Sequence, residues 1–299
     1  MLVLNDVVIT GNTGFIGNHL TTLLSDKKFK ILGISNKKSK NKNIKQITKD
    51  LHNIKNSDIP KNSTIIHLAA VSDISFCQEN PVACFKTNVL GTQHLLEISR
   101  NRNCNFLFVS SSHVYGSPDK LPLKENSSLN PSNIYAASKV SGESLCNAYR
   151  ESYGMKTIVA RLFSVYGPNS PPHLMINNLA TQIISKNTVK LGNLFPKRDF
   201  IFVEDVVSAI YFLLKKQKSG IFNIGTGKST SILEICKTFE NFSQKPIQIK
   251  QNPKLVRKND IPEIRSDISK MKKLGWKPKF TLYQGLKNTF DWYNSKFLN

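Results

Sequence analysis

Tyr135 and Lys139 form the residue pair in this sequence that is best suited to acid–base chemistry. They lie in the segment NIYAASKVSGE, residues 133–143, which we expect to be helical. On a helix, residues four apart lie on one face, one turn from each other. A nearby ammonium favours the tyrosinate and lowers the pKa of the phenol. The spacing therefore predicts a tyrosine that exchanges a proton with a hydroxyl or carbonyl oxygen near neutral pH.

A second polar cluster, FVSSSHVYGS at residues 108–117, begins where an apolar strand meets a loop. Serines and a histidine at such a point are typical of ordinary strand ends, but loops at strand ends also carry many active sites. Ser111 lies 24 residues before Tyr135. A Tyr-x-x-x-Lys spacing alone often arises by chance, so the interpretation of both clusters depends on the rest of the chain.

The segment TGNTGFIG, residues 10–17, is a glycine-rich turn between an expected strand at 7–11 and an expected helix at 15–26. Its three glycines permit a tight turn and a close approach of the backbone to a pyrophosphate, and a helix N-terminus attracts negative charge. A position between the first strand and the first helix is the context that a dinucleotide site requires. We therefore predict a dinucleotide cofactor.

The end of the second expected strand indicates which cofactor is favoured. NAD-binding sheets usually carry Asp or Glu there for the ribose hydroxyls. The segment GISNKKSK, residues 33–40, has no acid, and Ser35, Asn36 and Lys37 suit a 2′-phosphate. NADP(H) is favoured and NAD(H) stays possible, although a solvated basic loop is the simpler interpretation of the lysines. Asp50 and Leu51, expected to end the third strand, could flank the adenine.

Composition limits the other functional classes. No apolar run approaches the roughly 18–20 residues that span a bilayer, and the N-terminal segment MLVLNDVVITG is interpreted as a strand, not a signal peptide. The net charge of +22 comes from lysines spread along the chain, so we expect no nucleic-acid partner. The five cysteines are widely spaced, which favours free thiols in the cytoplasm and no metal site.

Strand-length apolar runs alternate with helix-length segments up to residue 163, which predicts a Rossmann-like, doubly wound parallel sheet of the α/β class. A single helix is expected around residues 82–100. After Phe163 the sequence pattern changes, first to a loop rich in Pro and Gly and then to shorter expected elements. We expect a dinucleotide-binding domain at residues 1–163 with about 200–240, and a smaller substrate-binding region at about 164–199 and 241–299.

With these motifs the chain resembles the extended short-chain dehydrogenase/reductase family, which comprises nucleotide-sugar epimerases, dehydratases and reductases. The similarity covers nearly the full length, through TGNTGFIG, IIHLAA, TNVLGT, SSSHVYG, YAASK, ARLFSVYGP, KRDFIFVEDV, NIGTG and LGWKP. The resemblance implies that Ser111, Tyr135 and Lys139 form a catalytic triad. Ser111 and Tyr135 would hydrogen-bond the C4 oxygen of the sugar, and Lys139 would bind the nicotinamide ribose. It also implies a homodimer through the helices around 82–100 and 135–152.

The resemblance assigns further binding residues. For the cofactor these are Gly11, Asn12, Thr13, Gly14, Phe15, Ile16, Gly17, Ser35, Asn36, Lys37, Asp50, Leu51, Leu68, Ala69, Ala70 and Asn88, with Tyr135 and Lys139. For the substrate they are Ser72, Ser112, His113, Ser164, Asn178, Arg198 and Arg257. The two arginines are expected to hold the diphosphate, a bidentate task that suits guanidinium. His113 is either an extra acid or substrate contact near C3 or C5, or a polar wall of the pocket.

In this family the two residues after the catalytic serine indicate the reaction. The 4,6-dehydratases carry Asp-Glu there, to eliminate water, whereas this chain has Ser112 and His113. The resemblance therefore implies a reductase or an epimerase. Residues 188–235 and 251–278 are similar to GDP-mannose dehydratases and GDP-4-keto-6-deoxymannose reductases. Those reductases often have Pro-Phe-Asn-His where residues 162–165 are Leu-Phe-Ser-Val, which leaves the base and the sugar open.

We therefore expect an NADPH-dependent 4-reductase of an NDP-4-keto-6-deoxy sugar, with a GDP-linked substrate favoured, in deoxysugar biosynthesis. An exchangeable NADPH suits net reduction, whereas an epimerase usually keeps a bound NAD. An NAD-dependent NDP-sugar 4-epimerase is the alternative enzyme. A redox-sensing or RNA-associated binding protein on the same fold is the non-enzymatic alternative, and the intact Ser-Tyr-Lys set disfavours it.

Overall fold

The computed structural model describes residues 6–39, 41, 44–186, 188–244, 246–252 and 261–297. They form two compact units. The first comprises Met1–Gly116, Ser128–Leu162 and Val207–Phe222, and the second comprises Ser117–Ser127, Phe163–Val206 and Asn223–Asn299. We expected residues 117–127, 200–206 and 223–240 with the dinucleotide-binding domain, and they cluster with the second unit. No helix in the described ranges is long and apolar enough to cross a membrane.

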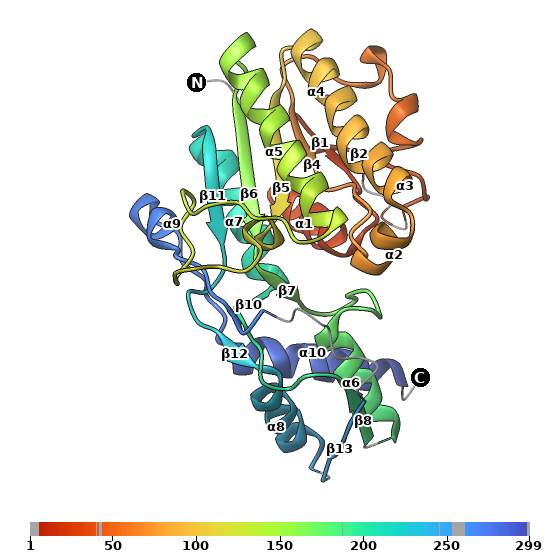
Figure 1. Cartoon of the computed structure of the whole chain (residues 1–299). Coiled ribbons are helices and arrows are strands. Elements are labelled where there is room, and N and C mark those ends of the chain that lie inside the picture. The colour runs from red at the N-terminus through yellow and green to blue at the C-terminus, as the bar shows by residue number, and fades with distance from the viewer. Residues whose placement is uncertain are drawn as a thin grey trace. The chain divides into compact units, whose positions relative to one another are not determined.

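A seven-stranded sheet forms the centre of the first unit, in the order β11-β6-β5-β4-β1-β2-β3 (Figure 1). Its strands are β1 (Asp6–Thr10), β2 (Lys30–Ser35), β3 (Lys45–Thr48), β4 (Thr64–His67), β5 (Asn105–Ser111), β6 (Thr157–Leu162) and β11 (Gly220–Ile224). From β3 to β6 every neighbouring pair is parallel. Such a sheet is buried on both faces, which explains the nearly continuous apolar strands of the sequence.

Helices cover both faces of this sheet. Right-handed crossovers from β1 proceed in opposite directions, so α1 (Phe15–Asp26) covers one face, and α4 (Gly91–Asn101) and α5 (Ile134–Tyr153) cover the other. The remaining helices of this unit are α2 (Ile74–Glu79), α3 (Pro81–Phe85) and most of α7 (Val203–Lys216), with the short turns η1 (Leu51–Asn53), η2 (Asn56–Asp58) and η4 (Ser112–Tyr115). The strand order reverses between β1 and β4, where sheets of this kind bind ligands beyond the carboxyl ends of the strands.

Two expected elements differ from the structure. The helix expected over 82–100 is divided into α3, the π-helical turn η3 (Lys86–Leu90) and α4. Buried Asn88 lies in that turn, with its carbonyl bonded to the Thr92 hydroxyl. The third strand ends at Thr48, not at Leu51, because Asp50 caps η1 by accepting a hydrogen bond from the His52 backbone.

The second unit is built from α6 (Met175–Lys186), α8 (Ile232–Ser243), α9 (Ser269–Leu274), α10 (Leu282–Phe297) and short strands. The strands pair as β7 (Ser164–Tyr166) with β10 (Phe200–Phe202), β8 (Thr188–Leu191) with β13 (Gln248–Gln251), and β9 (Lys197–Arg198) with β12 (Thr230–Ser231) and β14 (Glu263–Ile264). Buried Asp199 joins three of its segments, because its carboxylate accepts hydrogen bonds from Thr226, Gly227 and Ser266.

Candidate active site

The glycine turn brings the end of β1 against the loop that follows β4. Gly11 has a φ of +73°, and a Cβ atom there would lie 2.8 Å from the Ala69 backbone nitrogen. A Cβ atom at Gly17 would lie 2.1 Å from the Gly11 oxygen, so only glycine fits at either position. Helix α1 has no side-chain N-cap and no acidic residue in its first turn. The turn therefore fits the pyrophosphate of a dinucleotide, which binds to helix N-termini.

Ser111, Tyr135 and Lys139 come together where α5 crosses the end of β5. The Lys139 Nζ donates a hydrogen bond of 2.8 Å to the Val109 carbonyl and lies 4.8 Å from the centroid of the Phe108 ring. The same Nζ lies 5.9 Å from the centroid of the Tyr135 ring, and the Ser111 side chain hydrogen-bonds Tyr135. All three predicted catalytic side chains are buried. The structure thus assembles the set that the sequence predicted.

Burial sets the protonation of this pair. It raises the pKa of Tyr135 to about 12, against the opposing effect of the Ser111 hydrogen bond. It lowers the pKa of Lys139 to about 8. The spacing alone predicted a lowered phenol pKa, and this prediction is wrong. Desolvation of a buried group disfavours its charged form, and burial is the largest cause of the raised pKa of Tyr135. At neutral pH Tyr135 is therefore a proton donor.

His113 and Ser112 lie beside this set in η4. The His113 ring contacts the Tyr135 ring edge to face, with 6.0 Å between the centroids, and its side chain is exposed. The Ser111 Oγ accepts a hydrogen bond from the His113 backbone nitrogen at 3.3 Å, which fixes the start of the turn. Ser112 is buried, whereas Ser72 is exposed in the loop before α2. His113 thus presents an exposed imidazole beside the Tyr135 ring.

A buried ion pair lies behind Lys139, and the sequence analysis did not identify it. The Glu143 carboxylate accepts hydrogen bonds from Arg161, at 2.9 Å from Nε and 2.6 Å from Nη2, and one of 2.5 Å from Ser110. Arg161 also donates to the Tyr115 hydroxyl. Glu143 acts to raise the pKa of Lys139, which partly opposes the effect of burial. The sequence signal that could have indicated Glu143 was its spacing of four residues from Lys139.

At the end of the cofactor site where we expect the adenosine, polar side chains form hydrogen bonds with one another. The Thr13 Oγ1 donates to the Ser35 Oγ at 3.0 Å, and Ser35 donates to the Lys37 carbonyl at 2.6 Å. Asn12 is buried and donates to Gln46. The single Ser35 hydroxyl proton is therefore engaged, and the side chains of Asn36, Lys37 and Lys38 that follow it are exposed.

The other predicted cofactor residues are placed as follows. Phe15 and Ile16 begin α1 with Gly14 at its N-cap, Asp50 is exposed beside buried Leu51, and Leu68, Ala69 and Ala70 are half-buried beyond β4. Asn88 is buried, and its side chain bonds both backbone groups of Val71.

The predicted diphosphate and sugar contacts in the second unit lie on three separate elements. The Ser164 nitrogen, in β7, donates to the Asp199 carbonyl. Arg198, in β9, donates through Nη1 to the carbonyls of Lys197 and Ile261. Asn178, in α6, accepts a hydrogen bond from Gln182. Arg257 lies outside the described residues.

The fold and this site define a dinucleotide-binding enzyme with a Rossmann-like sheet. The family model described as GDP-mannose 4,6 dehydratase matches residues 8–289. The chain belongs to this family, the extended short-chain dehydrogenase/reductases that act as nucleotide-sugar epimerases, dehydratases and reductases.

Named relatives span several reactions. The uncharacterised UDP-glucose epimerase YtcB of Bacillus subtilis is 31% identical, over 97% of this chain and 98% of that protein. GDP-6-deoxy-D-mannose reductase of Pseudomonas aeruginosa is 29% identical, over 95% of this chain and 96% of that protein. Among solved structures, UDP-glucose 4-epimerase of Thermus thermophilus in complex with NAD has a TM-score of 0.88 at 26% identity, over 96% of this chain and 98% of that one.

These comparisons confirm the predicted fold class and the predicted family. They include epimerases and a reductase, and both UDP- and GDP-sugars among the names. The protein is therefore a nicotinamide-dependent nucleotide-sugar enzyme.

Proposed function

We propose that the protein is an NADPH-dependent 4-reductase of an NDP-4-keto-6-deoxy sugar, with a GDP-linked substrate favoured. The observation that carries this proposal is the pair that follows Ser111. Ser112 is buried and His113 is exposed in η4, where the dehydratases of the family carry Asp-Glu. Without that acidic pair, the elimination of water lacks its proton carriers at this position. A relative named as a GDP-6-deoxy-D-mannose reductase supports the choice of reaction and base.

The chain's own residues would supply geometry and a proton. Bound NADPH would supply the hydride that reduces C4. Tyr135, which is protonated at neutral pH, donates its phenolic proton to the C4 oxygen, and Ser111 hydrogen-bonds the same oxygen. The Lys139 ammonium, 5.9 Å from the tyrosine ring centroid, stabilises the resulting tyrosinate. Val109 accepts one of its three hydrogens, which leaves two for a ribose.

NADP(H) is the favoured cofactor in this proposal, because β2 ends without an acid and exposed Asn36 and Lys37 follow it. NAD(H) is the alternative, since the Thermus thermophilus neighbour contains NAD. For the substrate, we assign the diphosphate to Arg198 and Arg257, and contacts with the nucleotide sugar to Ser72, Ser164 and Asn178. A cytoplasmic location is supported by five cysteines that are all free and buried.

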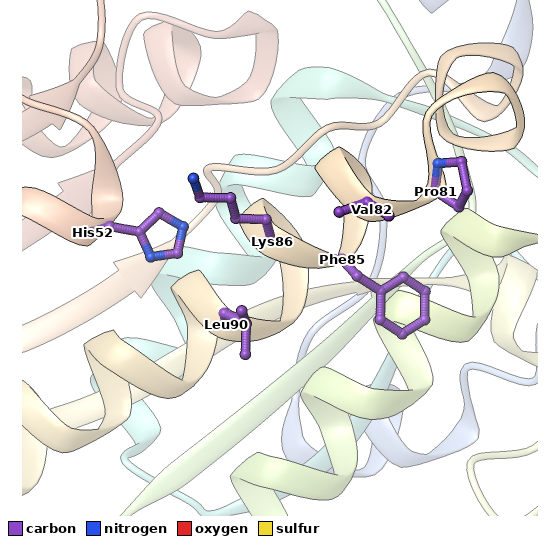
Figure 2. A pocket seen from close by; sticks show the side chains of 6 residues that line it. All are labelled: His52, Pro81, Val82, Phe85, Lys86 and Leu90. Carbon is purple, nitrogen blue, oxygen red and sulfur yellow. The ribbon is translucent and has the colours of Figure 1, made fainter.

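We also propose a homodimer formed through the α3–α4 and α5 surface. An open apolar groove of about 520 Å³ lies at the α3 and η3 part of this surface, and Figure 2 shows Pro81, Val82, Phe85, Lys86 and Leu90 lining it with His52. Val82 is 81% exposed and Leu90 is 53% exposed. Exposed apolar patches on soluble proteins often mark interaction sites.

An NAD-dependent 4-epimerase is the second candidate, because the names of both the Bacillus subtilis relative and the Thermus thermophilus neighbour are those of UDP-glucose epimerases. The same Tyr135 would then first take a proton from the C4 hydroxyl and later return one. Tightly bound NAD in the purified protein would favour this candidate, because an epimerase returns the hydride that it removes.

The test is NADPH consumption with GDP-4-keto-6-deoxymannose and with its dTDP and UDP counterparts, against Tyr135→Phe as the control. Stoichiometric oxidation of NADPH that is lost in the variant would support the reductase and identify the preferred base. No oxidation with any of the three keto sugars would refute the reductase and direct the work to epimerisation of intact NDP-hexoses.

A further inference from the structure

A continuous chain of buried polar groups runs from the glycine turn toward the catalytic helix, and His67 lies at its centre. The His67 Nδ1 lies 2.7 Å from the Thr10 Oγ1, and its Nε2 lies 3.0 Å from the Thr92 Oγ1. Thr10 and Thr92 are fully buried, and His67 is 2% exposed. The three residues belong to β1, β4 and α4, so the imidazole joins elements that are far apart in the sequence.

Counting protons assigns one tautomer to His67. The single hydroxyl proton of Thr92 is donated to the Asn88 carbonyl, at 2.6 Å. The contact between His67 Nε2 and Thr92 must then be an N–H donated by the ring. Burial, with a smaller effect of the Lys139 charge, lowers the pKa of His67 to about 3, so the ring is neutral. Its Nδ1 consequently accepts the hydroxyl proton of Thr10.

One arm of the chain supports the cofactor turn. Thr10 directly precedes Gly11, and its Oγ1 accepts a hydrogen bond from the Ala69 backbone nitrogen at 3.4 Å. A Cβ atom on Gly11 would meet the Ala69 backbone first. His67 therefore fixes the hydroxyl that holds the turn and the loop after β4 together.

The other arm reaches the catalytic helix. Asn88, whose carbonyl accepts from Thr92, donates through its side chain to the Val71 carbonyl and to the Ser138 Oγ, at 3.0 and 2.9 Å. Ser138 in turn donates to the Tyr135 carbonyl at 2.7 Å. The His67 ring also packs against Phe108, whose ring lies under the Lys139 Nζ. Both arms thus end at residues that carry the proposed chemistry.

We propose that His67 is a positioning residue, which in its neutral, Nε2-protonated form holds the glycine turn and the catalytic helix in one relative arrangement. A satisfied buried network adds little net stability compared with apolar groups of the same shape, but it specifies one geometry. The expected role is therefore in cofactor affinity and turnover rather than in folding. The effect on turnover rests on the proposed function, whereas the tautomer and the cofactor affinity do not depend on which reaction follows.

The first experiment is NMR of protein labelled with ¹⁵N at histidine, which reports the tautomer directly. We expect one histidine with a proton on Nε2 whose signals do not titrate while the protein stays folded. The signals are assigned by their loss in His67→Phe or, if that variant does not fold, by their shift in Thr92→Val. A proton on Nδ1, or titration near the ordinary histidine pKa, would overturn the proposal whatever the protein catalyses.

The second experiment compares dinucleotide binding between matched variants, with NADPH and NAD⁺ as probes followed by protein fluorescence. Thr92→Val removes the acceptor of the His67 N–H, while Ser99→Ala removes an equally buried hydroxyl that bonds the Leu95 carbonyl on the same helix, outside the chain of groups. We expect His67→Phe and Thr92→Val to raise the dissociation constant of the better-bound dinucleotide about tenfold, and Ser99→Ala to leave it within about twofold.

His67→Asn separates the two arms, since its amide oxygen can replace Nδ1 as the acceptor for Thr10 but cannot replace the donor to Thr92. We expect its dissociation constant and kcat to match those of Thr92→Val, because both variants keep the acceptor for Thr10 and lose the contact between residues 67 and 92. Equal losses in Thr92→Val and Ser99→Ala, or wild-type affinity in His67→Phe, would show that the network is structural only. If the wild-type protein binds neither dinucleotide, the proposed function fails, and the NMR experiment still decides the tautomer.

Discussion

Tyr135 and Lys139 have pKa values shifted in opposite directions because the same burial disfavours the charged form of each. The consequence is a protonated phenol beside an amine that titrates close to neutrality. We predict that Tyr135→Phe lowers kcat by about 10²–10⁴, the usual contribution of a positioned acid. Dinucleotide affinity should change little, since the variant keeps the ring. A variant with near wild-type kcat would show that another group, with His113 the nearest candidate, delivers the proton.

Lys139 also gives a prediction about stability and pH. Its pKa falls from 10.5 to about 8 on folding, so the unfolded chain binds more protons between these two values. Below about pH 8 the buried charge therefore lowers the free energy of unfolding by its full cost. The free energy of unfolding rises again as the pH increases from about 8 toward 10.5. Lys139→Met should be inactive and yet more stable than the wild type at pH 7, with a smaller difference at pH 10. Urea unfolding at both pH values measures this, and an equal difference at both would contradict it.

At the scale of elements, the contact between α5 and β6 depends on Glu143 and Arg161, which are 6% and 2% exposed. Breaking a buried pair leaves an uncompensated charge, so we predict that Arg161→Met lowers the free energy of unfolding by about 3–5 kcal/mol. The double variant Glu143→Gln/Arg161→Met should recover part of this loss, because neither charge remains. Denaturant unfolding of Arg161→Met, Glu143→Gln and the double variant measures the coupling. If the double variant loses as much free energy of unfolding as the two single variants together, the coupling is refuted.

Much of the element pattern was predictable because it depends on local sequence. Helix α1 has the bounds expected from its glycine turn and its apolar periodicity, and the alternation of strands and helices indicated the parallel sheet. The division of the helix over 82–100 could not be predicted. The π-helical turn is accompanied by contacts of Asn88 with Val71 and Ser138, which only the folded chain brings together. Helix α8 was missed although Ser231 and Glu234, a capping box, mark its start.

The candidate site likewise has features that depend on local sequence and others that depend on the folded chain. Ser111, Tyr135 and Lys139 could be predicted because their types and spacing carry the chemistry. The role of His67 could not be predicted, because it rests on a hydrogen bond with Thr10, which is 57 positions away in the sequence. The lowered pKa predicted for Tyr135 was wrong for a related reason, since spacing reports a neighbouring charge but not burial.

For the whole molecule, the proposed dimer makes the groove of Figure 2 an internal surface. We predict that Leu90→Glu shifts the protein toward a monomer, because a charge in an apolar interface is costly to desolvate. Light scattering after size-exclusion chromatography measures the mass. The control is Phe195→Glu, which changes a side chain that is 72% exposed in the second unit. A wild-type monomer, or the same response to both variants, would rule out this surface.

The most direct test of the central claim is the fate of the hydride. The protein is incubated with the keto sugar and NADPH that carries deuterium at the transferred position, and the product is analysed by mass spectrometry and NMR. The reductase account predicts one deuterium at C4 of the product for each NADPH consumed, and none with Tyr135→Phe. Conversion of an intact NDP-hexose without gain of deuterium, by protein that retains its own NAD, would contradict the account and identify an epimerase.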